Sequence, residues 1–250
     1  MMWNKPQQLN LISGTLFFIS FLLVLYGTLH TVLHLPKFNL RAVQLSAVPR
    51  QVDVAQIVVV VRNELRGNFF TVDLEAAQRA FEKLPWVRSA SVRRQFPWRL
   101  EVELEEHVAL ARWNGAELVN TYGEVFIAQS DRVMPEASGT HRPPLYGGSD
   151  RALPEFFGQP DSAAEVTQAY REFSRQLTPL EQQITQINLS PRHSWQLRLD
   201  SGLLLKLGRE QTQERMQRFV AAYPFGVGRE AQYLDLRYRN GFAVMYKEPV

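Results

Sequence analysis

The hydrophobic pattern of the chain begins with one long apolar segment. Residues 9–35 contain no Asp, Glu, Lys or Arg, and a helix needs about 20 such residues to cross the hydrocarbon core of a bilayer. A cleaved signal peptide would have a shorter apolar region and a small-x-small cleavage motif. This segment has neither. We therefore expect a transmembrane helix over residues 9–35, after a cytoplasmic tail of residues 1–8.

The orientation of this helix is predicted from the chain on either side of it. Basic residues flank both ends, Lys5 before it and Lys37 and Arg41 after it, so their count does not decide. A short tail before a single anchor is the usual arrangement for an exported domain, and a chain without cysteine needs no oxidation to fold. We expect a single-pass protein of the bacterial inner membrane, with a cytoplasmic N-terminus and its bulk in the periplasm.

The segment after the anchor alternates between strand and helix patterns. Period-two alternation predicts strands at residues 38–48, 86–94 and 98–106. Asp53 and Asp73 are suited to cap two helices with apolar residues at helical spacing. The order strand, helix, helix, strand, strand predicts an α+β domain over residues 36–107, with both helices on one face of a three-stranded sheet.

From residue 108 onward the pattern changes to shorter strands. Strands are predicted at residues 111–128, with a turn at Tyr122-Gly123, and at 195–199 and 203–207. Two amphipathic helices are predicted around residues 166–177 and 216–223. The Pro- and Gly-rich residues 135–160 predict an irregular loop with one short strand near Leu145. We expect a mostly antiparallel sheet covered by helices, a β domain over residues 108–250.

The last strand pattern is apolar on both faces. Asn240-Gly241 stands between two β-forming runs, residues 233–238 and 242–247, and this dipeptide predicts a hairpin with a two-residue turn. Phe242, Val244 and Tyr246 alternate with Ala243 and Met245 in the second run. Since no later segment pairs with its outer side, we expect this strand to be a sheet edge that a partner extends by adding a strand.

Charge leaves more than one interpretation open. Basic residues outnumber acidic residues by 28 to 25, and the excess is concentrated in residues 36–99. An exported domain meets no nucleic acid. The excess of basic residues therefore indicates a surface that binds lipid head groups, a surface that binds an acidic protein, or simply a solvated face.

Candidate catalytic chemistry is sparse. The motifs S-x-x-K, K-T-G, G-x-S-x-G and H-E-x-x-H are absent from the sequence. His30 and His34 have helical spacing within the anchor, where such residues usually reach the membrane interface. We expect no enzyme, no cofactor and no metal. The alternative is a periplasmic enzyme acting on peptidoglycan, or a ligand sensor, with an unrecognised site.

Several short motifs resemble, in order, those of one bacterial family. They are Gly67-Asn68-Phe69-Phe70, Leu84-Pro85-Trp86-Val87, Val92-Arg93-Arg94, Ala111-Arg112-Trp113, Tyr122-Gly123, Leu145-Tyr146-Gly147, Ser194-Trp195-Gln196-Leu197, Leu207-Gly208-Arg209 and Tyr233-Leu234-Asp235-Leu236-Arg237-Tyr238. Together they resemble the POTRA domain and the β domain of the FtsQ/DivIB family of cell-division proteins. The resemblance implies a non-catalytic scaffold that recruits and links proteins of the divisome at the septum.

The resemblance also implies partners and contact residues. In this family the β domain binds the coiled-coil protein FtsB, itself paired with FtsL, at its last strand. The positions implied here are Arg192, Arg237, Tyr238, Asn240, Gly241, Phe242, Val244 and Tyr246. Asn240 and Tyr246 depart from the Ser and Trp of the family members of enteric bacteria. Arg93 and Arg94 are expected to belong to a second contact surface, on the POTRA domain, for other membrane-anchored division proteins.

Overall fold

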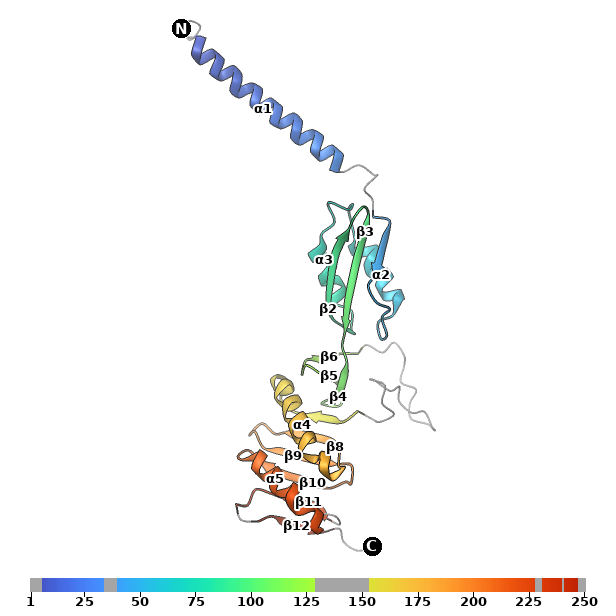
Figure 1. The fold of residues 1–250 in the computed structure, drawn as a ribbon, viewed down its shortest axis with the longest axis vertical. Coiled ribbons are helices and arrows are strands. Elements are labelled where there is room, and N and C mark those ends of the chain that lie inside the picture. Colours follow the sequence, from blue (N-terminus) through green and yellow to red (C-terminus); the bar gives the residue numbers. More distant parts are fainter. Residues whose placement is uncertain (1–5, 34–39, 129–152, 228–230, 240, 247–250) are drawn as a thin grey trace. The chain divides into compact units, whose positions relative to one another are not determined.

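The computed structural model describes residues 6–33, 40–128, 153–227, 231–239 and 241–246 (Figure 1). The chain divides into two compact units, Met1–Glu106 and His107–Val250. The elements of the first unit are α1 (Pro6–Leu33), β1 (Ala42–Leu45), α2 (Val54–Glu64), α3 (Leu74–Glu82), β2 (Val87–Gln95) and β3 (Arg99–Glu106).

Helix α1 carries the long apolar segment. Its residues Asn10–Thr31 have a mean hydropathy of 2.0, which makes the helix long and apolar enough to cross a membrane. The hydroxyl groups of Thr28 and Thr31 donate to the carbonyl oxygens of Val24 and Gly27, each at 2.7 Å. These polar side chains are therefore satisfied within the helix, as a lipid environment requires.

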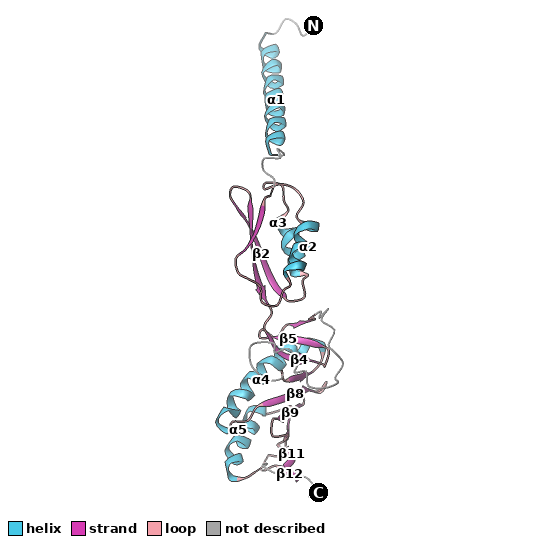
Figure 2. Ribbon diagram, turned by 90° about the vertical axis from the view of Figure 1, so that its right-hand side faces the viewer, coloured by secondary structure: helices cyan, strands magenta, loops and turns pink. Residues whose placement is uncertain are grey.

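The remainder of the first unit is a three-stranded sheet with two helices on one face (Figure 2). The sheet order is β1-β3-β2, with β1 parallel and β2 antiparallel to β3. The Asp53 carboxylate accepts a hydrogen bond from the Ala55 amide, and that of Asp73 accepts one from the Ala76 amide, so both predicted caps form. The core contains Val52, Ile57, Phe81, Val87, Ala90 and Val102. The predicted α+β module is confirmed.

The second unit is built on a nine-stranded sheet. Its strands are β4 (Ala109–Trp113), β5 (Glu117–Asn120), β6 (Val125–Phe126), β7 (Glu155–Phe157), β8 (Ile184–Leu189), β9 (Trp195–Leu199), β10 (Leu204–Gly208), β11 (Ala231–Asp235) and β12 (Ala243–Tyr246). The order across the sheet is β12-β11-β10-β9-β8-β7-β4-β5-β6. The pairs β4/β7, β7/β8 and β10/β11 are parallel and the other described pairs are antiparallel.

Two helices cover one face of this sheet, α4 (Ala163–Leu177) and α5 (Thr212–Ala222) (Figure 2). Short 3-10 turns, η3 (Pro160–Ser162), η4 (Thr178–Leu180) and η5 (Tyr223–Phe225), flank them. Phe173 of α4 and Phe219 of α5 are almost fully buried against strand residues such as Ile187 and Leu205. The two helices lie close to the predicted positions because their apolar spacing reflects this one buried face.

One strand prediction for the second unit was wrong, and two strands were not predicted. The segment expected as one strand from Ala111 turns at Asn114 and Gly115, where φ is 47° and 80°, so β4 and β5 form a hairpin. Strands β7 and β8 were not predicted, and β7 lies within the segment expected to be irregular; Leu145 lies outside the described residues. Strand β7 has parallel neighbours on both sides and buries Phe156 completely. Strands of this kind do not show a clear alternation of apolar and polar residues, and β7 has only three residues, so its sequence does not predict a strand.

The predicted two-residue hairpin at Asn240-Gly241 was also wrong. Asp235 pairs with Ala243, so the connection between β11 and β12 runs through residues 236–242. The chain leaves the β11–β12 ladder early because Leu236 donates its amide to the carbonyl of Lys206 on β10. Gly241 does not have the positive φ that such a turn demands, and Asn240 lies outside the described residues.

Candidate partner-binding edge

Strand β12 forms one edge of the nine-stranded sheet. Among the described residues its strand partner is β11, through pairs that include Leu234 with Val244 and Tyr233 with Met245. The backbone groups that point away from β11 therefore have no strand to pair with in the described chain. An edge of this kind is a template for strand addition.

The side chains of this region divide into a packed set and an exposed set. Phe242 and Val244 are half-buried and pack against the core of the unit. Met245 and Tyr246 are 49% and 63% exposed, and Tyr238, in the preceding loop, is 59% exposed. The packed residues hold the edge on the unit, while the exposed ones give it an apolar and aromatic surface.

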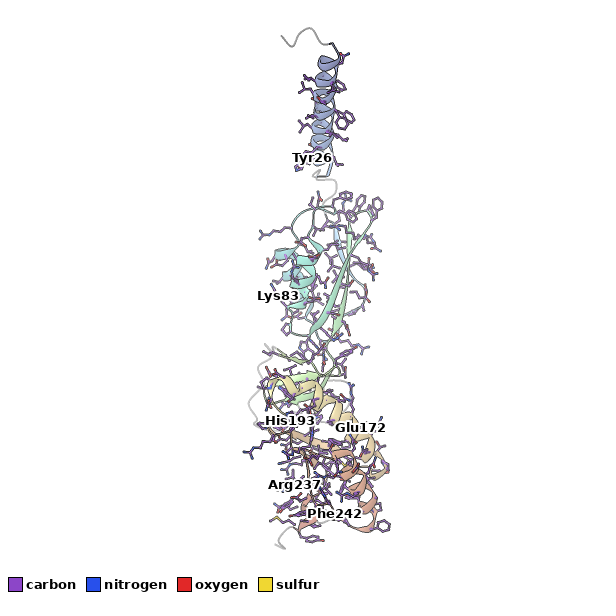
Figure 3. All side chains as sticks on the ribbon, turned by 90° about the vertical axis from the view of Figure 1, so that its left-hand side faces the viewer. Tyr26, Lys83, Glu172, His193, Arg237 and Phe242 are labelled. Atoms are coloured by element: carbon purple, nitrogen blue, oxygen red, sulfur yellow. The ribbon has the colours of Figure 1, made fainter. Side chains whose placement is uncertain are left out.

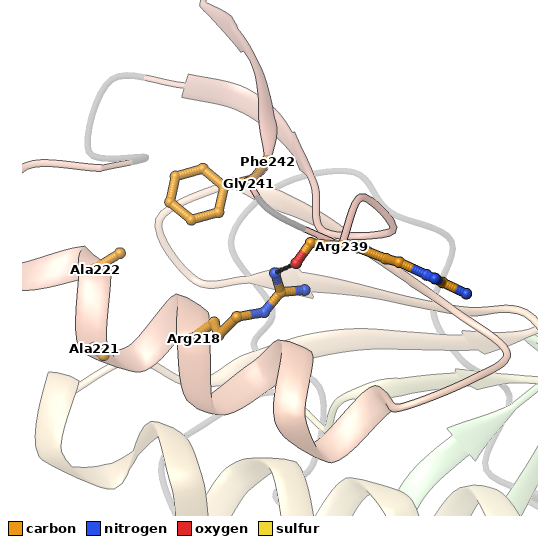
Figure 4. Close-up of a pocket in the computed structure, with 6 residues that line it drawn as sticks. All are labelled: Arg218, Ala221, Ala222, Arg239, Gly241 and Phe242. Carbon is orange, nitrogen blue, oxygen red and sulfur yellow. Dashed lines mark hydrogen bonds between the residues drawn. The ribbon is translucent and has the colours of Figure 1, made fainter.

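A hollow of about 480 Å³ lies beside the edge strand, between α5 and the β11–β12 loop. Its lining residues are Arg218, Ala221, Ala222, Arg239, Gly241 and Phe242 (Figure 4). The Arg218 guanidinium donates to the carbonyl oxygens of Arg239 at 2.7 Å, Tyr238 at 3.1 Å and Leu236 at 3.3 Å. One arginine of α5 thus holds three backbone groups of the loop that precedes β12.

Asp235 and Arg237 form an ion pair at the start of this loop. The Arg237 Nε and terminal nitrogen donate to the two Asp235 oxygens at 2.9 and 2.6 Å, and the Arg237 amide donates to the same carboxylate at 3.1 Å. The Asp235 side chain is 8% exposed and that of Arg237 58%. The hydrogen bonds from Arg237 lower the pKa of Asp235 although burial opposes this, and the same pairing raises the pKa of Arg237.

Arg192 lies in the exposed turn between β8 and β9, three residues before Trp195. Trp195 pairs with Gly208 of β10. A side chain placed on Gly208 would meet the Arg237 Cγ at 3.1 Å. The fold therefore brings the turn that carries Arg192 to the end of the sheet at which Arg237 lies, next to β12.

The sequence prediction missed two residues of this region. Asp235, which is 6% exposed, and Arg218 are both absent from the contact residues that the sequence predicted. The Asp-x-Arg spacing is a weak signal for the first, because Asp side chains commonly accept a hydrogen bond two residues on. No pattern identifies Arg218, since its partners are carbonyl groups distant in sequence.

The second predicted surface, on the POTRA-type module, divides into unequal parts. Arg93 is exposed and pairs with Glu101 at 3.5 Å and Glu103 at 3.0 Å. Arg94 donates to the carbonyl oxygens of Phe69 at 2.7 Å and Val72 at 2.8 Å, so it holds the loop before α3. The contact surface stays a prediction. Reversing the charge of Arg93 alone is its cleaner test, because changing Arg94 would also disturb this loop.

The described residues contain no group of three or more His, Cys, Asp or Glu that could hold a metal. The buried amides of Asn68 and Asn120 accept hydrogen bonds from nearby backbone amides, which accounts for their burial. No described feature favours the alternative of a peptidoglycan-acting enzyme or a ligand sensor.

The fold and this edge define a class of protein. Its members have a helix long and apolar enough to cross a membrane, a POTRA-like module, and a second unit with an open sheet edge. Residues 38–107 match the model "POTRA domain, FtsQ-type", and residues 111–237 match "Cell division protein FtsQ/DivIB, C-terminal". The chain belongs to the FtsQ/DivIB family of cell-division proteins, as its motifs suggested.

Several relatives support this assignment. The cell division protein FtsQ of Nitrosospira multiformis is 40% identical over 97% of this chain and 98% of its own length. That of Burkholderia pseudomallei is 37% identical over 97% of this chain and 94% of its own length. That of Escherichia coli is 36% identical over 71% of this chain and 62% of its own length. The family and the apolar helix indicate a membrane-anchored protein of cell division.

Proposed function

We propose that this chain is a non-catalytic scaffold of the bacterial divisome that binds the FtsB–FtsL complex by strand addition to β12. The observation that carries the proposal is the position of β12 at the edge of the sheet, with its outer backbone groups unpaired by any described strand. Backbone hydrogen bonds to this edge supply affinity, and the side chains of the added strand supply specificity.

The surroundings of the edge suit one kind of partner segment. Tyr246 and Met245 offer exposed apolar surface, and Arg237 with Arg192 offers positive charge at one end of the sheet. Because Asp235 already pairs with Arg237, this guanidinium is held in place with donors still exposed to solvent. An extended segment with apolar residues at alternate positions and a carboxylate near Arg237 fits these groups.

The proposal includes a location. The N-terminal tail lies in the cytoplasm, α1 crosses the inner membrane, and both units after it lie in the periplasm at the division septum. The charge-free segment of α1 supports the membrane span. Family membership supports the site of action.

Tyr246→Ala tests the edge directly. Tyr246 is a central exposed aromatic side chain, and removing such a residue from an interface typically costs about 2 kcal/mol, or about 30-fold in affinity. Tyr122→Ala is the matched control because Tyr122 is equally exposed, 60% against 63%, but lies in the turn between β5 and β6, toward the opposite edge. Affinity of the full chain for the FtsB–FtsL complex of the same bacterium is measured by titration calorimetry.

Proline substitution in β12 tests the backbone contribution. Consecutive N–H groups of an edge strand point alternately toward and away from their neighbour, so one of Val244→Pro and Met245→Pro removes an outward donor and the other a bond to β11. We expect the variant that removes the outward donor to fold and to lose binding to the FtsB–FtsL complex. Unchanged affinity in both prolines and in Tyr246→Ala, with normal circular dichroism, would refute strand addition at β12.

A further inference from the structure

Exposed aromatic side chains lie in the turn between β2 and β3 and in the loop before α3. Phe96 is 82% exposed and Phe70, on the loop before α3, is 42% exposed. Both rings lie against the buried Phe69, with centroid distances of 6.4 Å for Phe96 and 5.2 Å for Phe70. Phe96 is not part of the core of the module. An exposed cluster of aromatic side chains of this kind is a candidate contact surface.

Two basic side chains belong to the same region. The Arg41 guanidinium lies 4.6 Å from the centroid of the Trp98 ring, and Arg99 follows Trp98 in the chain. Both arginines are exposed, and neither has an ion pair among the residues that the structure describes. We call the set Arg41, Phe70, Phe96, Trp98 and Arg99 the hairpin tip.

The acidic residues of β3 lie farther along the strand and are already paired. Glu101 and Glu103 bind Arg93, and Glu105 binds Arg88. Glu106 accepts hydrogen bonds from the backbone amides of residues 50–52. The positive charge of the hairpin tip is therefore not neutralised by the same hairpin.

The hairpin tip lies at the end of the module where the chain enters from α1. The Arg41 amide donates to the Trp98 carbonyl at 3.1 Å, and Ala42 pairs with Arg99. Helix α1 ends at Leu33, so at most about 25 Å of extended chain separates it from Leu40. If α1 spans a membrane, the tip is tethered within a short distance of the lipid head groups.

We propose that the hairpin tip binds the membrane surface, with Phe96 and Trp98 in the interface and Arg41 and Arg99 on anionic lipid head groups. Aromatic side chains with adjacent arginines are the composition that membrane interfaces favour. The tether keeps the tip at high effective concentration, so that a weak contact is sufficient. This contact would fix the module against the bilayer. It rests on the proposed membrane anchor, but not on the proposed β12 interaction.

Spin labelling tests the proposal in the full chain. The sequence has no cysteine, so Gln95→Cys places a single label beside Phe96. Lys83→Cys places a single label at the C-terminal end of α3, whereas Phe70 of the hairpin tip precedes the N-terminal end of this helix (Figure 3). The chain is reconstituted in vesicles of phosphatidylglycerol and phosphatidylethanolamine, or of phosphatidylcholine alone. We expect the label at residue 95 to be shielded from a water-soluble nickel complex and accessible to oxygen only with the anionic lipid, and the label at residue 83 to stay exposed to the nickel complex throughout.

Variants separate the two contributions. Phe96→Ser should expose the label at residue 95, whereas Phe225→Ser, at a phenylalanine that is 88% exposed in the other unit, should not. Each of Arg41→Gln and Arg99→Gln should shift the equilibrium toward the free tip by about fivefold, and Arg62→Gln on α2 should not.

Two outcomes overturn the inference. In the first, alkaline carbonate leaves the chain in the vesicles but the label at residue 95 is exposed in both lipid mixtures, which shows that the tip does not bind the bilayer. If shielding of this label then appears only after native membrane proteins are added, the tip binds a protein partner instead. If carbonate releases the chain, the anchor fails and the inference fails with it. Neither outcome bears on FtsB–FtsL binding at β12.

Discussion

Asp235 and Arg237 fix the point at which the chain leaves β11 for the edge strand. The Asp235 carboxylate is buried and accepts hydrogen bonds from the amide, the Nε and a terminal nitrogen of Arg237. Such charge-assisted bonds are about twice as strong as neutral ones. A residue expected to interact with a partner is therefore also part of the local structure that presents the edge, and its loss would act through both.

Asp235→Asn should weaken this local structure in a pH-dependent way. At pH 7 we expect a loss of about 1–3 kcal/mol in the opening free energy of β11, because a hydrogen-bonded buried charge is removed. The pKa of Asp235 is lowered by folding from its ordinary 3.8, so its stabilisation is present above 3.8 and is lost as the pH falls through the folded pKa. Hydrogen exchange of the β11 amides measures this stabilisation at pH 7 and below pH 3.

The comparison of wild type and variant at each pH is decisive. The two chains should differ at pH 7 and converge in acid. A difference that stays constant across this range would show that the carboxylate charge does not stabilise the loop. Asp200→Asn, an exposed turn aspartate on β9–β10, is the control for a general effect of acid.

At the scale of elements, helix α5 positions the edge strand through one side chain. Arg218 donates to three carbonyl groups of the β11–β12 loop, and Phe242 and Ala222 both line the hollow beside this loop (Figure 4). Strand β12 is short, and within the described part of the chain it pairs with one strand, β11. Its position therefore depends on what holds the loop before it.

Arg218→Gln should loosen the loop and weaken partner binding without unfolding the second unit. Hydrogen bonds from a charged group contribute about 1.5–3 kcal/mol, so we expect a loss of affinity for FtsB–FtsL of about tenfold or more. Arg209→Gln is the control, since Arg209 is 71% exposed and pairs with the adjacent Glu210. Faster hydrogen exchange in β12 with unchanged affinity would mean that the loop does not prepare the edge for binding.

At the scale of the whole molecule, the chain forms two compact units, the first of which contains the apolar helix α1. Each unit has its own core, built around Phe81 in the first and around residues such as Phe173 and Leu205 in the second. This organisation suits a protein that gathers partners near a membrane, because each unit can offer a separate surface to them.

The proposed topology predicts the behaviour of fusions. A reporter that is active only in the periplasm, fused after Val250, should be active, because in the proposed topology the charge-free α1 crosses the membrane once. The same reporter fused ahead of Met1 of the full chain should be inactive. The control is a fusion with Leu16→Arg and Leu23→Arg, which places two charges in the span, each costing about 2.5–3.5 kcal/mol at the helix centre. Activity of the reporter ahead of Met1 and silence of the reporter after Val250, both in stable fusions, would reverse the orientation.

The sequence by itself determined the features that a single element encodes. The charge-free run predicted α1, Asp53 and Asp73 predicted two helix starts, and alternation predicted β2 and β3. The ordered motifs predicted the family that the comparisons show. The helix and strand signals each lie within one segment of the chain, where local backbone and burial preferences act directly. The family signal comes from several short motifs taken in order along the chain.

The tertiary structure decided the features that depend on distant residues. Only the sheet order buries Phe156 of β7 between parallel strands. The edge position of β12 was already predicted from the sequence, and the order of the described strands confirms it. Only the contacts of Leu236 with Lys206, and of Arg218 with three loop carbonyls, move the start of the last strand from Phe242 to Ala243 and replace the two-residue turn by a longer connection. A turn dipeptide states a local preference of the backbone, and hydrogen bonds to other elements outweigh it once the chain is folded.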